Sequence, residues 1–228
     1  SSPYDNSSSP QPIYVRVEAN AGAGCYIVEP NPVFNLVVNH KATASGLTDL
    51  QTCDDDLDGI MTFDLEQQTA IVLGSQIASD FIVTYHETQP DADANSNSLT
   101  SPYTNTITGQ QTIFVRVEEI GLESCYETTQ FDVIVNPLPA TTTMTALAVC
   151  DDDTDGIGSF TLTTKDTEAL NGQTGIAVSY HETQGDADTS ASPLSSPYIN
   201  TTINSQIIFI RLENTTTNCF STMPMELR

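Results

Sequence analysis

The sequence predicts an all-β protein made of tandem Ig-like β-sandwich repeats, each with a short helical insertion. One observation is a long internal repeat: the motif that begins at Cys53 returns at Cys150, and many of the later motifs return at a similar spacing. Another is the alternation of apolar and polar residues over 113–118, which is typical of a strand with one buried face. Detailed self-similarity over so long a period indicates tandem domains, and several short strands closed by a hairpin favour a sandwich.

The repeat divides the chain into five segments. Residues 1–40 match only the end of a repeat and are called the N-terminal hairpin, whereas 48–137 (repeat two) and 145–228 (repeat three) are full copies. Residues 41–47 and 138–144 are predicted linkers, and we expect them to be short and stiff because proline favours extended chain. An isolated hairpin is marginal in water, so residues 1–40 are expected to take partner strands from upstream sequence or from another copy.

Within each full repeat, the predicted elements occur in the same order. Apolar spacing over 65–73 and 162–170 is compatible with one or two helical turns ended by glycine. Residues 81–85 and 176–180 are predicted strands. Alternating apolar residues then predict a final antiparallel hairpin, over 113–135 in repeat two.

Charge and composition exclude several classes of partner. Lys and Arg total 6 against 30 Asp and Glu, which leaves a net charge of −24. Such a chain is repelled by nucleic acid and by anionic membrane surfaces. No stretch approaches the roughly 18 apolar residues of a membrane helix, so direct membrane insertion is not expected. Five cysteines at recurring places and scarce lysine indicate an exported, extracellular protein with structural disulfides.

An acidic loop comes directly after the first cysteine of each full repeat and has the pattern D-x-D-x-D-G. Alternate carboxylates can surround a hard cation, and glycine makes the bend that brings in the next backbone carbonyl. Ca²⁺ is favoured over Mg²⁺ because an all-protein oxygen cage suits the larger ion. The predicted ligands are Asp54, Asp56, Asp58 and the Ile60 carbonyl, and Asp151, Asp153, Asp155 and the Ile157 carbonyl.

The loops are not EF-hands, because Leu65 and Leu162 stand where an EF-hand has its bidentate glutamate. Further ligands must therefore come from elsewhere in the fold. The alternative interpretation of each loop is a solvated acidic turn.

The cysteines allow two pairings. Cys53–Cys125 and Cys150–Cys219 would staple each repeat, whereas Cys25–Cys53 and Cys125–Cys150 would link neighbours. We expect the first, because the last strand should carry the chain roughly 30 Å, at ~3.3 Å per residue, to the opposite pole before the next repeat begins. Bridged Cα atoms must lie within ~7 Å. This prediction assumes that a repeat's start and its final turn share a pole.

Histidine and serine motifs do not indicate an enzyme. His86 and His181 each begin His-Glu-Thr-Gln, which lacks the second histidine of H-E-x-x-H and lies at the end of a strand, so both are interpreted as structural. No serine has a G-x-S-x-G setting, and no nucleophile–base pair is evident.

Three further sets of residues are interpreted as structural or as weak evidence for function. Arginines that precede a glutamate by two positions are expected to form fold-fixing pairs; they are Arg16, Arg116 and Arg211. A weaker acidic cluster in each repeat is interpreted as a surface turn or helix cap; its residues are Asp91, Asp93, Asp186 and Asp188. Glycosylation sequons begin at Asn6, Asn200 and Asn214.

The repeated motifs, taken in order, resemble those of very large surface proteins of flavobacterial (Bacteroidetes) species. They are Cys-Asp-Asp-Asp, Tyr-His-Glu-Thr, Asp-Ala-Asp, Ser-Pro-Tyr, Phe-Val-Arg-Val-Glu, Cys-Tyr and Val-Asn-Pro-Leu-Pro. Proteins of this kind include ones associated with gliding motility and type IX secretion. The resemblance implies an exported, cell-surface adhesin or filament stalk of many Ig-like repeats and supplies no catalytic residue.

The sequence leaves two functional hypotheses. The first is a structural segment of an adhesin stalk or surface filament, stiffened by Ca²⁺ and by intradomain disulfides. Its partners would be other repeats of the parent chain or copies of itself in a fibre. The second is a module that binds glycans or proteins at the cell surface. The composition favours the first, because the chain has no Trp and its Tyr residues are scattered.

Overall fold

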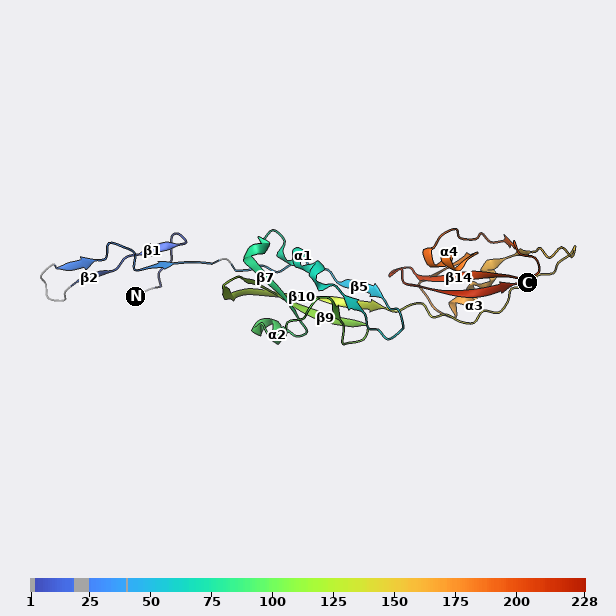
Figure 1. Ribbon diagram of the computed structural model, residues 1–228, viewed down its shortest axis with the longest axis horizontal. Helices are drawn as coiled ribbons and strands as arrows, with labels where there is room; N and C mark the ends of the chain where they lie inside the picture. The colour runs from blue at the N-terminus through green and yellow to red at the C-terminus, as the bar shows by residue number, and fades with distance from the viewer. Residues whose placement is uncertain (1–2, 19–24, 40) are drawn as a thin grey trace. The chain divides into compact units, whose positions relative to one another are not determined.

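The computed structural model describes residues 3–18, 25–39 and 41–228 (Figure 1). The described chain divides into two compact units; the first contains residues 1–46, 68–98 and 114–129, and the second contains 47–67, 99–113 and 130–228. Strands β9 and β10 run through both units. The predicted all-β class is confirmed.

Within its described residues, 3–18 and 25–39, the N-terminal hairpin contains four short strands. Strand β1 pairs antiparallel with β4, and β2 pairs antiparallel with β3. Their bounds are β1 (Gln11–Ile13), β2 (Arg16–Glu18), β3 (Tyr26–Val28) and β4 (Phe34–Leu36).

Repeat two is built around a four-stranded sheet with the order β5-β10-β9-β7. Strands β6 and β8 form a separate antiparallel pair. The strands are β5 (Leu50–Cys53), β6 (Thr62–Phe63), β7 (Phe81–His86), β8 (Tyr103–Thr104), β9 (Gln110–Glu119) and β10 (Leu122–Asn136). The helices are η1 (Leu65–Gln68), α1 (Thr69–Leu73), η2 (Ala78–Asp80) and α2 (Gln89–Ala94).

Repeat three has a similar element order around a three-stranded sheet, β12-β14-β15. Its strands are β11 (Ser159–Phe160), β12 (Ile176–His181), β13 (Tyr198–Ile199), β14 (Gln206–Asn214) and β15 (Phe220–Leu227). Its helices are η3 (Leu162–Lys165), α3 (Asp166–Leu170) and α4 (Gln184–Thr189).

The predicted helices and strands are confirmed, but one α-helix in each repeat and the short η2 of repeat two were missed. The predicted helix over 65–73 is η1 followed by α1, and the one over 162–170 is η3 followed by α3. The missed α-helices, α2 and α4, are six residues each and begin at threonine caps. Thr88 accepts a hydrogen bond from the Asp91 N–H, and Thr183 accepts the matching bond in repeat three.

The core of repeat three lies between its first half and its final hairpin. Phe160, Leu162 and Tyr180 from the first half form one buried cluster with the apolar side chains of the hairpin. The hairpin members are Ile208, Ile210, Leu212, Met223, Met225 and Leu227. Alternate residues of β14 therefore point into the core, as the alternation in the sequence predicts.

The first strand of a repeat runs parallel to the last one. In repeat two, β5 pairs with the end of β10, with Leu50 opposite Val133 and Cys53 opposite Asn136. In repeat three, Leu147 pairs in parallel with Leu227. The cysteine that ends this first segment therefore lies beside the end of the last strand, which decides how the cysteines can pair.

Candidate cation and disulfide sites

The first acidic loop brings its three alternate aspartates together. Asp54, Asp56 and Asp58 each offer a carboxylate oxygen, and these atoms lie within 4.8 Å of one another. Oxygen ligands at 2.3–2.6 Å from one Ca²⁺ lie at most about 5 Å apart, so the spacing fits a shared ion. The Ile60 N–H donates to the Asp58 carboxylate at 2.7 Å, which places Ile60 at the end of the loop.

Asp54 anchors this loop to the fold. Its two carboxylate oxygens accept N–H donors from Leu57 at 2.9 Å and Gly59 at 3.0 Å, and the residue is 7% exposed. Oδ1 also accepts from the Asp56 N–H at 3.3 Å, so Oδ2 is the oxygen that keeps a lone pair for a further partner. Asp56 and Asp58, in contrast, are exposed to solvent.

The second loop repeats this arrangement. Asp151, Asp153 and Asp155 meet the same 4.8 Å limit. Asp151 accepts N–H donors from Thr154 and Gly156, both at 2.8 Å. The Ile157 N–H donates to Asp155 at 2.7 Å, as Ile60 does in the first loop.

The charges of each loop act mainly on its middle aspartate. The Asp58 N–H lowers the pKa of Asp56, but desolvation and the negative charges of Asp58 and Asp55 outweigh it and raise this pKa above its usual value. The same competition around Asp155 raises the pKa of Asp153. A bound cation would remove this repulsion. The first aspartate of each loop, Asp54 or Asp151, already accepts hydrogen bonds from backbone N–H groups.

An asparagine missed at the sequence level holds each loop in place. Asn105 donates to the carbonyls of Gly59 at 2.9 Å and Ile107 at 2.8 Å, and accepts from the Met61 N–H at 2.6 Å. A side chain on Gly59 would place its Cβ 3.1 Å from the Gly109 nitrogen, and Gly59 has a φ of +75°. The bend therefore requires glycine, and the asparagine fixes it.

Asn200 makes the same three contacts in repeat three. It donates to Gly156 at 2.9 Å and Thr202 at 2.7 Å, and accepts from Gly158 at 2.6 Å. The residue is 5% exposed, so its sequon is engaged in the fold. The signal in the sequence is the recurrence of Ser-Pro-Tyr-x-Asn-Thr, which begins at Ser101 and Ser196.

The disulfide joins two cysteines that neither expected pairing had combined. Cys53 bonds to Cys219, across a sequence separation of 166, with a Cα–Cα distance of 5.5 Å. The predicted pairs Cys53–Cys125 and Cys150–Cys219 are therefore wrong. Cys125 and Cys150 both have free thiols.

The parallel first strand explains the error. Cys53 lies opposite Asn136, which is 136 − 125 = 11 positions beyond Cys125 on β10, or roughly 36 Å at ~3.3 Å per residue. In repeat three, the Val149 N–H donates to the Arg228 carbonyl, at the far end of β15 from Cys219. A repeat's start and its final turn therefore lie at opposite poles, and a bond within one repeat cannot form.

The comparison with protein families agrees with this bond. Residues 49–139 and 146–228 each match the family described as the Flavobacterium inter-domain disulphide bond domain. The chain belongs to this family. Cys53 lies in the first matched segment and Cys219 in the second, so the bond joins the two.

Similarity to other proteins is low. None of the curated proteins matches the chain. A SusE-like surface-located polysaccharide-binding protein from the Bacteroides thetaiotaomicron heparin utilisation locus is 11% identical, with a TM-score of 0.29; the match covers 88% of this chain and 36% of that one. A Bacteroides ovatus mixed-linkage glucan-binding protein is 10% identical, with a TM-score of 0.22, and the match covers 79% of this chain and 42% of that one. Mouse protocadherin gamma C3 is 13% identical, with a TM-score of 0.23 and coverages of 96% and 76%.

The present chain thus spans less than half the length of the first two structures. Among the residues that the structure describes, no helix is long and apolar enough to cross a membrane.

His86 and His181 are structural, as predicted. His86 is fully buried, with Nδ1 2.7 Å from the Ser96 carbonyl oxygen and Nε2 2.9 Å from the Thr84 hydroxyl. His181 is held in the same way by Ala191 and Ser179. Both ring nitrogens are occupied, so neither histidine can act as a base or bind a metal without breaking these contacts.

The arginine–glutamate pairs also fix the fold. In repeat two, the guanidinium of Arg116 donates to Glu118 at 2.7 Å and stacks on Tyr126 at 3.6 Å. It also donates to the carbonyls of Ala92 and Asp93 at the end of α2, both at 3.1 Å. The predicted role is confirmed for Arg116, because its buried charge is paired and hydrogen-bonded on several sides. The matching pair in the N-terminal hairpin, Arg16–Glu18, is exposed to solvent.

The weaker acidic cluster belongs to the start of α2. Asp91 accepts hydrogen bonds from Thr88, Asn97 and Ser96, and these bonds lower its pKa. Its interpretation as a helix cap is confirmed, since Thr88 caps the helix and Asp91 lies in its first turn.

Proposed function

We propose that this chain is a non-catalytic structural segment of an extracellular surface fibre or adhesin stalk, in which disulfides tie consecutive repeats together. The observation that carries the proposal is the bond between Cys53 and Cys219. Closing a loop of 166 positions stabilises the folded chain by about 5 kcal/mol in the chain-entropy model. Disulfides of this kind persist in oxidising compartments, which supports an extracellular location.

The bond also gives the chain a way to carry tension. A pull on the two ends of the chain passes from Cys53 through the sulfurs to Cys219, so the residues between them carry none of it. A stalk must hold its length under load, and a covalent bypass of this kind prevents two repeats from extending. The intradomain disulfides first expected would protect each repeat separately and leave the linker between them under tension.

The linkers are anchored to the repeat that comes after them. The Gln76 side chain accepts from the Thr43 N–H at 3.0 Å and donates to its carbonyl at 2.8 Å. Gln173 makes the same two contacts with Ala140, at 2.8 and 2.9 Å. Each amide binds the extended linker as a neighbouring strand would, and this supports a stiff connection between repeats.

Calcium at the two acidic loops is the second part of the proposal. It is supported by the three convergent carboxylates of each loop and by the raised pKa of Asp56 and Asp153. The first loop begins at Asp54, immediately after the bonded Cys53. An ion there would order the loop directly next to the bonded cysteine.

The test is to pull single molecules of the chain by its two ends, with the disulfide intact and after reduction. The proposal requires a much shorter extension for the oxidised chain. Protease treatment of intact cells that express the parent protein tests the location, since a surface segment is cleaved without lysis. Glycan or protein binding is the alternative function, and a glycan array with this chain distinguishes it from a purely structural role.

A further inference from the structure

The N-terminal hairpin contains a polar network that both full repeats also contain. The Gln11 amide donates to the Tyr4 hydroxyl and its carbonyl accepts from the Ser7 N–H at 2.8 Å. The Asn6 amide donates to the Ser8 carbonyl at 2.7 Å. The matching residues are Tyr103, Asn105 and Gln111 in repeat two, and Tyr198, Asn200 and Gln206 in repeat three.

The charged face of the hairpin is equally complete. Arg16 pairs with Glu18 and stacks on Tyr26 at 4.1 Å. The corresponding groups of the full repeats are Arg116, Glu118 and Tyr126, and Arg211, Glu213 and Phe220. The hairpin is therefore the second half of a repeat, with its internal contacts already formed.

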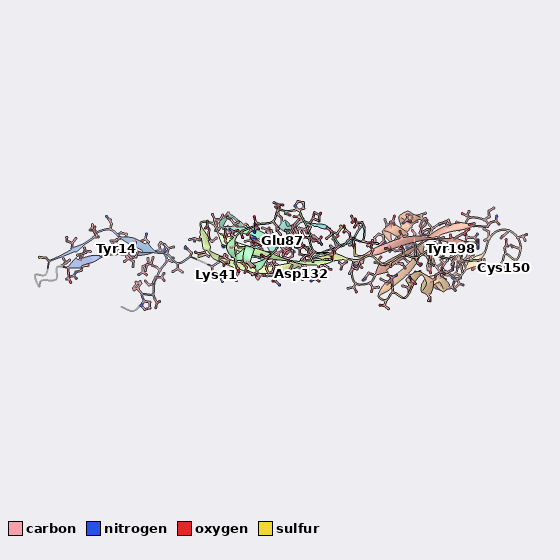
Figure 2. All side chains as sticks on the ribbon, turned by 90° about the horizontal axis from the view of Figure 1, so that it is seen from below. Tyr14, Lys41, Glu87, Asp132, Cys150 and Tyr198 are labelled. Atoms are coloured by element: carbon pink, nitrogen blue, oxygen red, sulfur yellow. A yellow bond between two sulfur atoms is a disulfide. The ribbon has the colours of Figure 1, made fainter. Side chains whose placement is uncertain are left out.

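Its apolar face, however, is uncovered. Val17 is 64% exposed and Phe34 is 51% exposed, whereas their counterparts Val117 and Phe131 in repeat two are 0% and 4% exposed. The side chains of Tyr4, Ile13, Tyr14, Phe34 and Leu36 line a groove of about 570 Å³, and Figure 2 labels Tyr14 on this segment. Exposed apolar surface of this extent marks an interaction site.

Repeat three shows what covers the matching face. There, Phe160, Leu162 and Tyr180 of the first half pack on the β14 and β15 side chains in one cluster. Strand β12 also pairs along β14, with Ser179 opposite Arg211. The same sequence pattern over 48–100 supplies these elements in repeat two.

Asn6 adds a specific requirement. Its counterparts Asn105 and Asn200 each donate to the carbonyl of the loop glycine, Gly59 or Gly156. A partner that only filled the groove with apolar side chains would give the Asn6 amide no glycine carbonyl to which it could donate. A partner with a D-x-D-x-D-G loop would place its glycine carbonyl there.

We infer that residues 3–18 and 25–39 form a docking surface for the first half of another repeat of this same family. The docked segment contributes an acidic loop whose glycine carbonyl accepts from Asn6. It also contributes a strand that pairs with Arg16–Glu18, and apolar side chains that fill the groove. This inference extends the proposed function by naming a partner, and it depends neither on cation binding nor on the Cys53–Cys219 bond.

The test grafts a second copy of residues 48–100 directly before residue 2 of the full chain. Thr100 of the copy then precedes Ser2-Pro3 as it precedes Ser101-Pro102 in repeat two. We expect amide exchange at Val17 and Ile27 to slow at least about 100-fold, because these residues pass from an open hairpin into a closed core. Repeat three is the internal reference and keeps its own protection.

Two matched variants sharpen the result. A graft with Phe63→Asp and Leu65→Asp in the added copy alone has the same length, and it should leave exchange in the hairpin fast. Asn6→Ala in the intact graft should lose part of the protection and loosen the added acidic loop. Unchanged exchange in the intact graft would overturn the inference. So would a dimer of the ungrafted chain in which the hairpins of two copies protect each other, because no first half of a repeat would then be the partner. Neither outcome alters the extension measured under tension, so the proposed function is tested separately.

Discussion

Reduction of the Cys53–Cys219 bond should lengthen the chain under tension by about 550–600 Å. The magnitude comes from the sequence separation of 166 and an extended length of ~3.3–3.6 Å per residue. While the bond is intact, tension applied at the two ends reaches only the residues outside it. After reduction, or in Cys219→Ser, both repeats can unfold and extend. An optical trap with handles at the two ends measures this difference directly.

The free cysteines supply the matched control. Cys125→Ser and Cys150→Ser leave the Cys53–Cys219 bond in place, so these variants should show the short extension of the oxidised wild type. If the bonds lay within repeats, either variant would release about one repeat's length. That result, or equal extension before and after reduction, would refute the mechanical argument.

Three further results are expected. The chain should melt at a higher temperature in Ca²⁺ than in EDTA, by an amount equivalent to about 2.7 kcal/mol at a hundredfold excess over Kd. The double variant Asp56→Asn/Asp153→Asn should gain much less stability from Ca²⁺. Equal melting curves in both buffers would mean that the loops are solvated turns. Asn200→Ala should cost about 1–3 kcal/mol in a denaturant titration, because buried backbone groups lose their partner, and an unchanged midpoint would contradict the role of this side chain. Hydrogen bonds from Lys165 and Thr145 lower the pKa of Glu168 to about 2. The stabilisation from these contacts should therefore be complete above pH ~4.5 and lost as the pH falls towards 2. Glu168→Gln should remove that part of the pH dependence, which NMR titration of the neighbouring amides can measure.

The secondary structure was predictable where periodicity is strong. Strands over 81–85 and 113–118 and the helix over 65–73 can be inferred from the spacing of their apolar residues, which tertiary packing then reinforces. Helices α2 and α4 were missed because each is six residues long and rich in aspartate. Their signal was local: a capping threonine, Thr88 or Thr183, with an aspartate three positions later.

The cysteine pairing could not be predicted because it depends on strand direction. Cys53 ends β5, a short strand that the sequence analysis did not predict, and the local sequence does not fix whether this strand runs parallel or antiparallel to β10. A parallel pair moves Cys53 to the pole opposite Cys125. Likewise, the Asn105 contact with Gly59 joins residues 46 positions apart. Only the recurrence of the asparagine marked it, and recurrence alone does not reveal a contact.

The bond, the acidic loop and a linker meet at one place in repeat two, and this proximity connects the two parts of the proposed function. Cys53 lies opposite Asn136, and the Asp54 N–H donates to the Asn136 carbonyl at 2.9 Å, two positions before the linker that begins at residue 138. The disulfide therefore lies beside a loop of mutually repelling carboxylates. A cation bound there would hold Asp54, Asp56 and Asp58 together and keep the end of β5 paired with β10. We therefore expect Ca²⁺ to slow amide hydrogen exchange most strongly at residues 50–60, next to the disulfide. The size of this slowing should differ between the oxidised and the reduced chain.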